Sequence, residues 1–397
     1  LLALCTLNLP HHANTNTNTL TPARWHQQRR NAILDSHGPH VRPLLKPDKR
    51  TLPAPIAVNA AQRGLAATAA HLPAAELVPL ALSVGATLSL WQFALLHDVK
   101  HGTAALPAGV APNAVLFIGS LPSVFGYFLY LRSGHLSHHK DFGAASVRDL
   151  FDSADAGFED GDVMFVAHRQ LVRGDDAARR PGFFGNRAVG GLGLSISRSF
   201  YALLWRDAVG WEPWNGAVYS MGMLLERAAL VVNDKVVAVT GRNAFFPNKP
   251  RRFHDMCARH ARVSAALQLA LLATCGPGAL LWLYLSEVGW QLPTHPASAM
   301  FVSNHPSLVA PDGSCQPTSS VYWGGRAYDW LCCWSNLHVE HHDFPDAPCW
   351  RLAELRVCAS AHYSESALSG CRSGWLGTLR RTFSGGRVFY ACSESRS

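Results

Sequence analysis

Long apolar stretches alternate with charged segments along the chain, and one uncharged stretch has the length of a membrane-spanning helix. Leu77 to Leu96 contains 20 residues and no charged side chain, and a helix of roughly 20 apolar residues crosses the hydrocarbon layer of a bilayer. Further apolar stretches occupy residues 52–71, which include Arg63, and residues 264–286. A poorer candidate occupies residues 217–240, which include Glu226, Arg227, Asp234 and Lys235. The pattern predicts an all-α, polytopic membrane protein with about four transmembrane helices.

The segments between these stretches predict how the chain is divided. Residues 1–22 are polar and of low complexity, which predicts a disordered leader. Residues 23–51 are basic and contain several prolines, which predicts a cytosolic segment beside the membrane. Residues 52–357 would form the membrane domain, and residues 358–397 a cytosolic tail. Two parts of the membrane domain are expected outside the bilayer, an acidic loop and an aromatic interfacial helix: residues 140–190 and 192–214.

Composition favours the membrane class over a soluble protein of two or three domains, which the length of 397 residues also allows. Charged residues make up only 16% of the chain, against roughly 25% in soluble domains. The net charge of +8 suits an anionic membrane surface, and no nucleic-acid-binding motif accompanies it. The 10 cysteines form no Cys-x-x-Cys pair, which predicts reduced thiols in a protein that faces the cytosol.

Histidines gather in three clusters at the ends of apolar segments. Spacings of three and four residues bring the rings onto one face of a helix, where neutral imidazole nitrogens can bind a transition metal. Eight histidines exceed the three or four ligands of a zinc ion, so the number favours a dinuclear centre. The predicted ligands are His97, His101, His135, His138, His139, His338, His341 and His342. A single pair at this spacing would more often be a surface or packing feature.

Other residues are assigned with less support from spacing. Asp98, Glu340 and Asp343 lie within the clusters and could accept hydrogen bonds from ring N–H groups of the ligands. His305 precedes the third cluster and is a possible ninth ligand. His168, His254 and His260 have no partner at ligand spacing, which predicts a place on the polar surface.

A shared metal site restricts the path of the chain through the membrane. Residues 103–131 connect the first two clusters and are too short for two crossings, which need about 40 residues. We therefore expect a re-entrant or interfacial segment there. A hairpin formed by residues 217–240 and 264–286 would return the third cluster to the same side. The loop of this hairpin is basic, however, and the positive-inside rule would place it in the cytosol, which conflicts with the hairpin.

The clusters resemble the three histidine boxes of the membrane-bound fatty acid desaturase and hydroxylase superfamily. Among its branches the chain is most similar to the sphingolipid delta-4 desaturases. His338 to Pro348 resembles their third box and its Asp-Phe-Pro tail, and Arg29 to Leu34 with Pro47-Asp48 resembles their leader. Gln316 to Gly324 and Arg198 to Leu203 also look like segments of this branch.

The resemblance implies a di-iron enzyme of the endoplasmic reticulum membrane with several spans and with its histidine boxes facing the cytosol. It would use O2 and electrons from NAD(P)H, which reach the enzyme through cytochrome b5 and the reductase of cytochrome b5. Cytochrome b5 would be a separate protein, because this chain has no His-Pro-Gly-Gly haem motif. Zinc is redox-inert and could not support such chemistry. The substrate implied is dihydroceramide, desaturated between C4 and C5, with a possible C4-hydroxylase activity.

Three alternatives remain open at the level of sequence. The first is an acyl-lipid desaturase, and the second is another membrane di-iron hydroxylase, such as a carotenoid or sterol oxygenase. The third is not an enzyme: an inactive paralogue, or a membrane protein that binds metal without catalysis.

Overall fold

The computed structural model describes residues 22–121, 139, 250–304 and 318–364. It also describes single residues or short runs within 220–242, 308–316 and 368–384. Some expectations fall outside this part of the chain: the leader up to residue 21, the acidic loop at 140–190, the interfacial helix at 192–214 and the ligands His135, His138 and His305.

Regular structure in the described residues is almost entirely helical, which confirms the all-α prediction for this part of the chain. The exception is one antiparallel pair of two-residue strands, β1 (Leu308–Val309) and β2 (Cys315–Gln316). One described helical run, Ala74–Lys100, is long and apolar enough to cross a membrane. This run contains the stretch Leu77 to Leu96 predicted from the sequence. The expected number of about four transmembrane helices stays a prediction.

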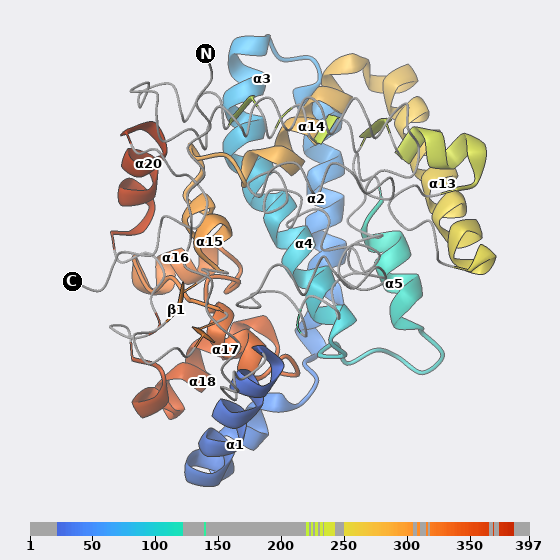
Figure 1. Cartoon of the computed structure of the whole chain (residues 1–397). Helices are drawn as coiled ribbons and strands as arrows, with labels where there is room; N and C mark the ends of the chain where they lie inside the picture. The colour runs from blue at the N-terminus through green and yellow to red at the C-terminus, as the bar shows by residue number, and fades with distance from the viewer. Residues whose placement is uncertain are drawn as a thin grey trace, which may run out of the picture.

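Helices from two distant parts of the sequence pack side by side around this run (Figure 1). They are α2 (Pro53–Ala69), α3 (Ala74–Leu80), the π turn η3 (Ala81–Gly85), α4 (Ala86–Lys100) and α14 (Pro277–Gly289). α3, η3 and α4 follow one another without a break, and α14 contacts all three. Ala66, Ala81 and Trp282 belong to the apolar cluster buried between them. The bundle thus carries the chain to His97 and His101 at the end of α4.

The helical run changes its geometry at η3. Pro79 lies inside α3, where it has no N–H to donate and its ring crowds the preceding turn. The π turn begins two residues later and is wider than a turn of α-helix. At its end, Gly85 faces α14 so closely that a Cβ atom there would overlap the hydroxyl of Ser286. The close approach of the two helices therefore favours a glycine at this position.

Residues 264–286, expected as one span, are divided between two helices. α13 (Arg251–Cys275) ends before Gly276, whose φ of 84° lies in the region that favours glycine. α14 begins at Pro277, which fits the first position of a helix but cannot continue one. The expectation of a continuous helix across residues 264–286 is therefore wrong.

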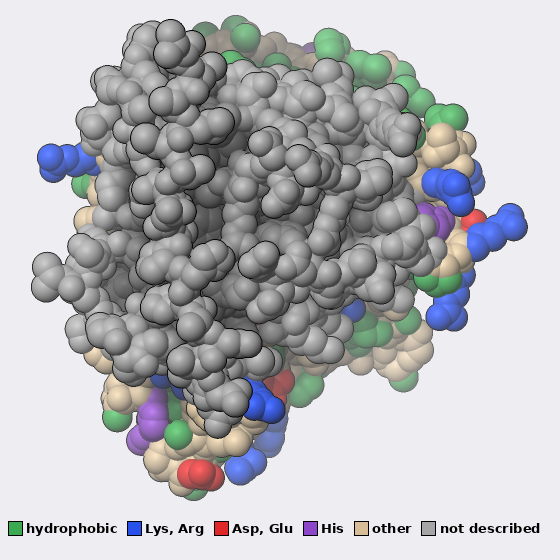
Figure 2. Space-filling model, in the orientation of Figure 1, with side chains coloured by type: hydrophobic (Ala, Val, Ile, Leu, Met, Phe, Trp, Pro, Cys, Tyr) green, Lys and Arg blue, Asp and Glu red, His purple; other side chains and the backbone are tan. Residues whose placement is uncertain are grey.

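α13 turns its histidines toward the protein and its arginines toward solvent. His254 and His260 are only 8% and 2% exposed, so their expected place on a polar surface is wrong. Burial is possible because a partner is available: the His260 Nε2 atom lies 2.9 Å from the Ser120 hydroxyl. The exposed side chains include Arg251, Arg252, Arg259 and Arg262. Basic side chains gather at this edge of the molecule (Figure 2).

Polar side chains inside the predicted spans find partners within the protein. Asn59 donates to the carbonyls of Gly119 and Leu121, at 2.8 and 2.6 Å, and Arg63 also donates to Leu121. These carbonyls stand at and just beyond the end of α5 (Pro112–Gly119), so α2 supplies donors that α5 itself lacks. Arg227 is fully buried and donates to the Oε1 atom of Gln291. Internal partners explain charges in otherwise apolar stretches.

The other helices surround the third histidine cluster. α1 (Pro22–Val41) and α18 (Leu352–Cys358) contact α17 (His338–Asp343), as Figure 1 shows below the bundle. Ile33, Leu337 and Phe344 are fully buried in the apolar cluster between them. The remaining elements are η1 (Arg42–Leu45), η2 (Lys49–Thr51), α15 (Ser298–Ser303), α16 (Gly325–Leu331), η5 (Cys349–Arg351), η6 (Ser360–His362) and α20 (Gly374–Ser384).

Asp48 connects the N-terminal segment to the ends of two histidine clusters. Its backbone N–H donates to Thr103 O at 2.8 Å, two residues after His101. Its carboxylate accepts hydrogen bonds from Arg50 and, at 3.1 Å, from Arg351 in η5. The hydrogen bonds from Arg50 hold the pKa of Asp48 below its usual range, and the contacts to Arg351 act in the same direction. The segment expected as a flanking region is thus packed against the core.

Candidate metal centre

Two helix ends and one further histidine bring the clusters together. His97 and His101 occupy the last turn of α4 and its C-cap. His338, His341 and His342 occupy the short helix α17, and His139 is the described member of the second cluster. In four residues, the ring nitrogens that could bind a metal lie within 4.8 Å of one another: His97, His101, His139 and His341. Three segments far apart in sequence therefore meet at one point.

The ring nitrogens of these histidines point at one another. His139 Nε2 lies 3.0 Å from His101 Nε2 and 3.2 Å from His341 Nε2. A neutral imidazole has one donor nitrogen and one acceptor nitrogen, so a single N–H on His139 could not satisfy both neighbours in a dry site. A cation that accepts all three lone pairs would satisfy them together. The donor set therefore fits a transition metal.

A second pair of nitrogens lies beside the first group. His342 Nε2 is 3.1 Å from His338 Nε2, and the ring centroids of His342 and His139 are 4.1 Å apart. The dinuclear centre expected from the sequence stays a prediction. His135 and His138, which the sequence assigns to the same centre, lie outside the described residues.

The surroundings keep His341 in its neutral form. Burial lowers the pKa of His341 well below its ordinary value, and the neighbouring histidines, among them His97 and His101, lower it further. A neutral imidazole retains the lone pair that a metal needs, so this ring stays ready for binding at neutral pH.

The three carboxylates predicted to support the ligands have other described partners. Glu340 is fully buried and accepts from the hydroxyls of Ser320 at 2.6 Å and Tyr322 at 2.9 Å. Burial raises the pKa of Glu340, against the effect of these hydroxyl donors. Asp98 accepts from the Cys349 N–H at 2.8 Å, and its Oδ1 atom lies 3.8 Å from His97 Nδ1. A direct bond from a ligand ring to any of the three stays a prediction.

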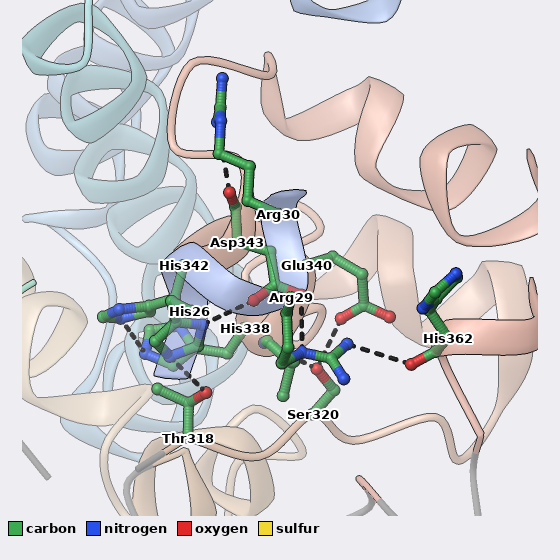
Figure 3. Close-up of polar contacts among 11 residues, drawn as sticks. His26, Arg29, Arg30, Thr318, Ser320, His338, Glu340, His342, Asp343 and His362 are labelled. Atoms are coloured by element: carbon green, nitrogen blue, oxygen red, sulfur yellow. Dashed lines mark hydrogen bonds and ion pairs between the residues drawn. The ribbon is translucent and has the colours of Figure 1, made fainter. Parts of the chain in front are cut away.

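Asp343 is held by α1 instead. Its Oδ1 atom lies 2.7 Å from His26 Nδ1, and its Oδ2 atom accepts from Arg29 Nε at 3.0 Å (Figure 3). His26 carries no signal in the sequence, because no second histidine lies at ligand spacing from it. From the sequence, Arg29 is assigned only to a leader that resembles that of one branch of desaturases.

A mostly apolar pocket opens beside the histidines. Its volume is about 90 Å³, and His97, His338 and His341 contribute to its wall. The apolar part of the wall comes mainly from α4, α15 and the segment between α14 and α15, and includes Leu90, Phe93, Trp290, Met300 and Phe301. Asn304 and Ser335 add polar groups. An apolar chain in this pocket would end against the metal-binding nitrogens.

Convergent histidines in the wall of an apolar pocket define a class of proteins that hold metal next to an apolar substrate. The chain belongs to the fatty acid desaturase family, whose model matches residues 73–368. It is similar to human sphingolipid delta(4)-desaturase/C4-monooxygenase DES2, with 24% identity over 340 residues, which cover 85% of this chain and 82% of the human protein. No solved structure matches the chain. The resemblance inferred from the histidine boxes is thus confirmed, and the family supports an oxidoreductase that acts on lipids.

Proposed function

We propose that the protein is a di-iron, O2-dependent desaturase of the sphingoid base of dihydroceramide at C4–C5, with C4-hydroxylase as a second activity. The observation that carries the proposal is the convergence of His97, His101, His139 and His341 beside the apolar pocket. This arrangement suits the removal of hydrogen from an unactivated methylene group, for which acid-base side chains alone are insufficient.

The histidines would hold iron, which when bound supplies the one-electron and oxygen chemistry that methylene oxidation requires. In the described part of the chain, His97, His101, His139 and His341 form one set of donors, and His338 with His342 forms the beginning of another. The residues of α4 and α17 fix the direction of these donors, because the helices themselves are packed in the core.

The pocket would bind the lipid chain and exclude water from the site. Phe93, Trp290 and Phe301 lie on its apolar wall, and Trp290 stacks on Phe93 with a centroid distance of 5.8 Å. Such a wall holds one methylene of the chain near the metals, and orientation of this kind lowers the barrier to reaction.

A polar group in the same pocket favours the sphingoid base over a simple acyl chain. The Oδ1 atom of Asn304 is buried and has no hydrogen-bond partner among the described residues. A buried acceptor without a donor costs about 1–3 kcal/mol. Dihydroceramide carries hydroxyl and amide donors within two carbons of C4, whereas an acyl chain has none near its reacting carbons. The similarity to the human sphingolipid desaturase supports the same choice.

The proposal also gives the setting of the enzyme. It would lie in the endoplasmic reticulum membrane with several spans, its histidines on the cytosolic side, and it would receive electrons from NAD(P)H through cytochrome b5 and its reductase. The apolar run Ala74–Lys100 supports a membrane location, and the family does as well.

Expression in cells that lack their own sphingolipid desaturase, followed by mass spectrometry of the lipids, tests the proposal. We expect ceramides with a C4–C5 double bond and a smaller amount of the C4-hydroxylated base. A new double bond in fatty acyl chains, with unchanged sphingoid bases, would instead identify an acyl-lipid desaturase. Unchanged lipids from protein that contains zinc or no metal would identify the non-catalytic alternative.

A further inference from the structure

A buried histidine of α1 lies against the third histidine cluster without being available as a ligand. The Nδ1 atom of His26 lies 2.7 Å from Asp343 Oδ1, and its Nε2 atom lies 3.0 Å from Thr318 Oγ1. A carboxylate only accepts hydrogen bonds, so the Nδ1 atom donates to Asp343, while the Nε2 atom is engaged by the threonine hydroxyl. Both nitrogens are thus occupied. His26 is 5% exposed, and this arrangement leaves it no lone pair for a metal.

The ring of His26 also packs on a predicted ligand. Its centroid lies 5.0 Å from that of His342, and the two planes are inclined by 32°. His342 is directly followed by Asp343, so His26 restrains this ligand both through its ring and through the next residue. The contact places an element from the start of the described chain beside the centre.

Two arginines of α1 hold the last residue of α17 and the residues that follow it. Arg29 Nε donates to Asp343 Oδ2 at 3.0 Å, so both oxygens of this carboxylate are engaged by α1. Arg30 forms two parallel bonds to Asp346, at 2.6 and 2.8 Å, and lies over the ring of Phe344. Paired bonds between a guanidinium and a carboxylate fix direction as well as distance.

We propose that α1 is a positioning element for the metal centre, in which His26 and Arg29 orient His341 and His342 through Asp343 (Figure 3). This inference rests on the proposed metal-binding function. α17 has only six residues, too few to be stable by itself, so its orientation depends on outside contacts. α1 supplies these contacts on the side of the third cluster.

Two variants of His26 separate positioning from packing. His26→Asn keeps an N–H near the place of Nδ1 and loses the ring, whereas His26→Phe keeps a ring and loses the donor. Gln27→Ala removes an exposed side chain from the same turn of α1 and serves as the matched control. Each protein is purified in detergent with iron, and the release of iron to a chelator is followed over time.

We expect His26→Phe to release iron about 10- to 100-fold faster than the wild type, the range seen when the outer partner of a metal ligand is lost. His26→Asn should release it within a few fold of the wild type, and Gln27→Ala should match the wild type. The thermal unfolding of the metal-free proteins should be similar for both His26 variants. A merely structural role would instead lower the stability of the metal-free Phe and Asn variants without separating their release rates.

A charge exchange tests the neighbouring arginine independently. Arg30→Asp should increase the rate of iron release. The double variant Arg30→Asp with Asp346→Arg should bring this rate part of the way back to that of the wild type, because the ion pair forms again with its charges reversed. Equal release from His26→Phe and the wild type would overturn the inference while leaving the proposed function intact. A wild-type protein that binds no iron would overturn the proposed function itself.

Discussion

At the scale of single residues, His341 has the most central place in the candidate centre. Its Nε2 atom approaches that of His139, and its ring centroid lies 4.4 Å from that of His97. We expect His341→Ala to abolish detectable desaturation and to lower the iron content, while membrane insertion stays unchanged. The loss of activity should exceed the roughly 10- to 100-fold effect of removing a residue that only supports a metal ligand. His40→Ala changes an exposed histidine at the end of α1 and should leave both readouts unchanged. Full activity of His341→Ala in a lipid profile would refute the site.

At the scale of elements, the contact between η3 and α14 depends on the absence of a side chain at Gly85. A Cβ atom there would overlap the Ser286 hydroxyl, so Gly85→Ala should destabilise the protein by about 1–3 kcal/mol. Adding Ser286→Ala should recover much of this loss, because the overlapping oxygen is removed. Gly64→Ala in α2, where no atom lies within 4 Å of the added carbon, should be neutral or slightly stabilising. Thermal unfolding in detergent measures all three, and equal losses for Gly85→Ala and Gly64→Ala would contradict the close approach.

The sequence predicted those elements whose signal lies within one continuous stretch. The apolar run through Leu77 and Leu96 is a helix, and the spacing of His338, His341 and His342 does belong to a helix. The sequence failed where partners decide the outcome. His260 is buried because Ser120 satisfies it, and His26 contacts a residue 317 positions away. Contacts between residues so far apart in the sequence cannot be predicted from the local spacing of residue types.

At the scale of the whole molecule, the metal would join parts of the chain that are distant in sequence. One set of ring nitrogens comes from α4, His139 and α17. In the unfolded state these ligands are apart, so bound metal would stabilise the folded state. At a free metal concentration of 100 times Kd this stabilisation is about 2.7 kcal/mol. We expect a chelator to lower the unfolding temperature of the wild type and to have a smaller effect on His341→Ala. An identical shift in the two proteins would show that the stabilising metal lies elsewhere.

The π turn after Pro79 contains one residue more than an α-helical turn, so it decides how a change in chain length before the first cluster would act on the site. Each residue of an α-helix advances the chain by about 100° around the axis, and the π turn accommodates an additional residue in this rotation. Deleting one residue between Ala81 and Gly85 would therefore let the run close into regular α-helix, with His97 and His101 in nearly their present direction relative to α3. Deleting one residue between Ala86 and Leu96, where the helix is already regular, would instead turn both histidines by about 100°.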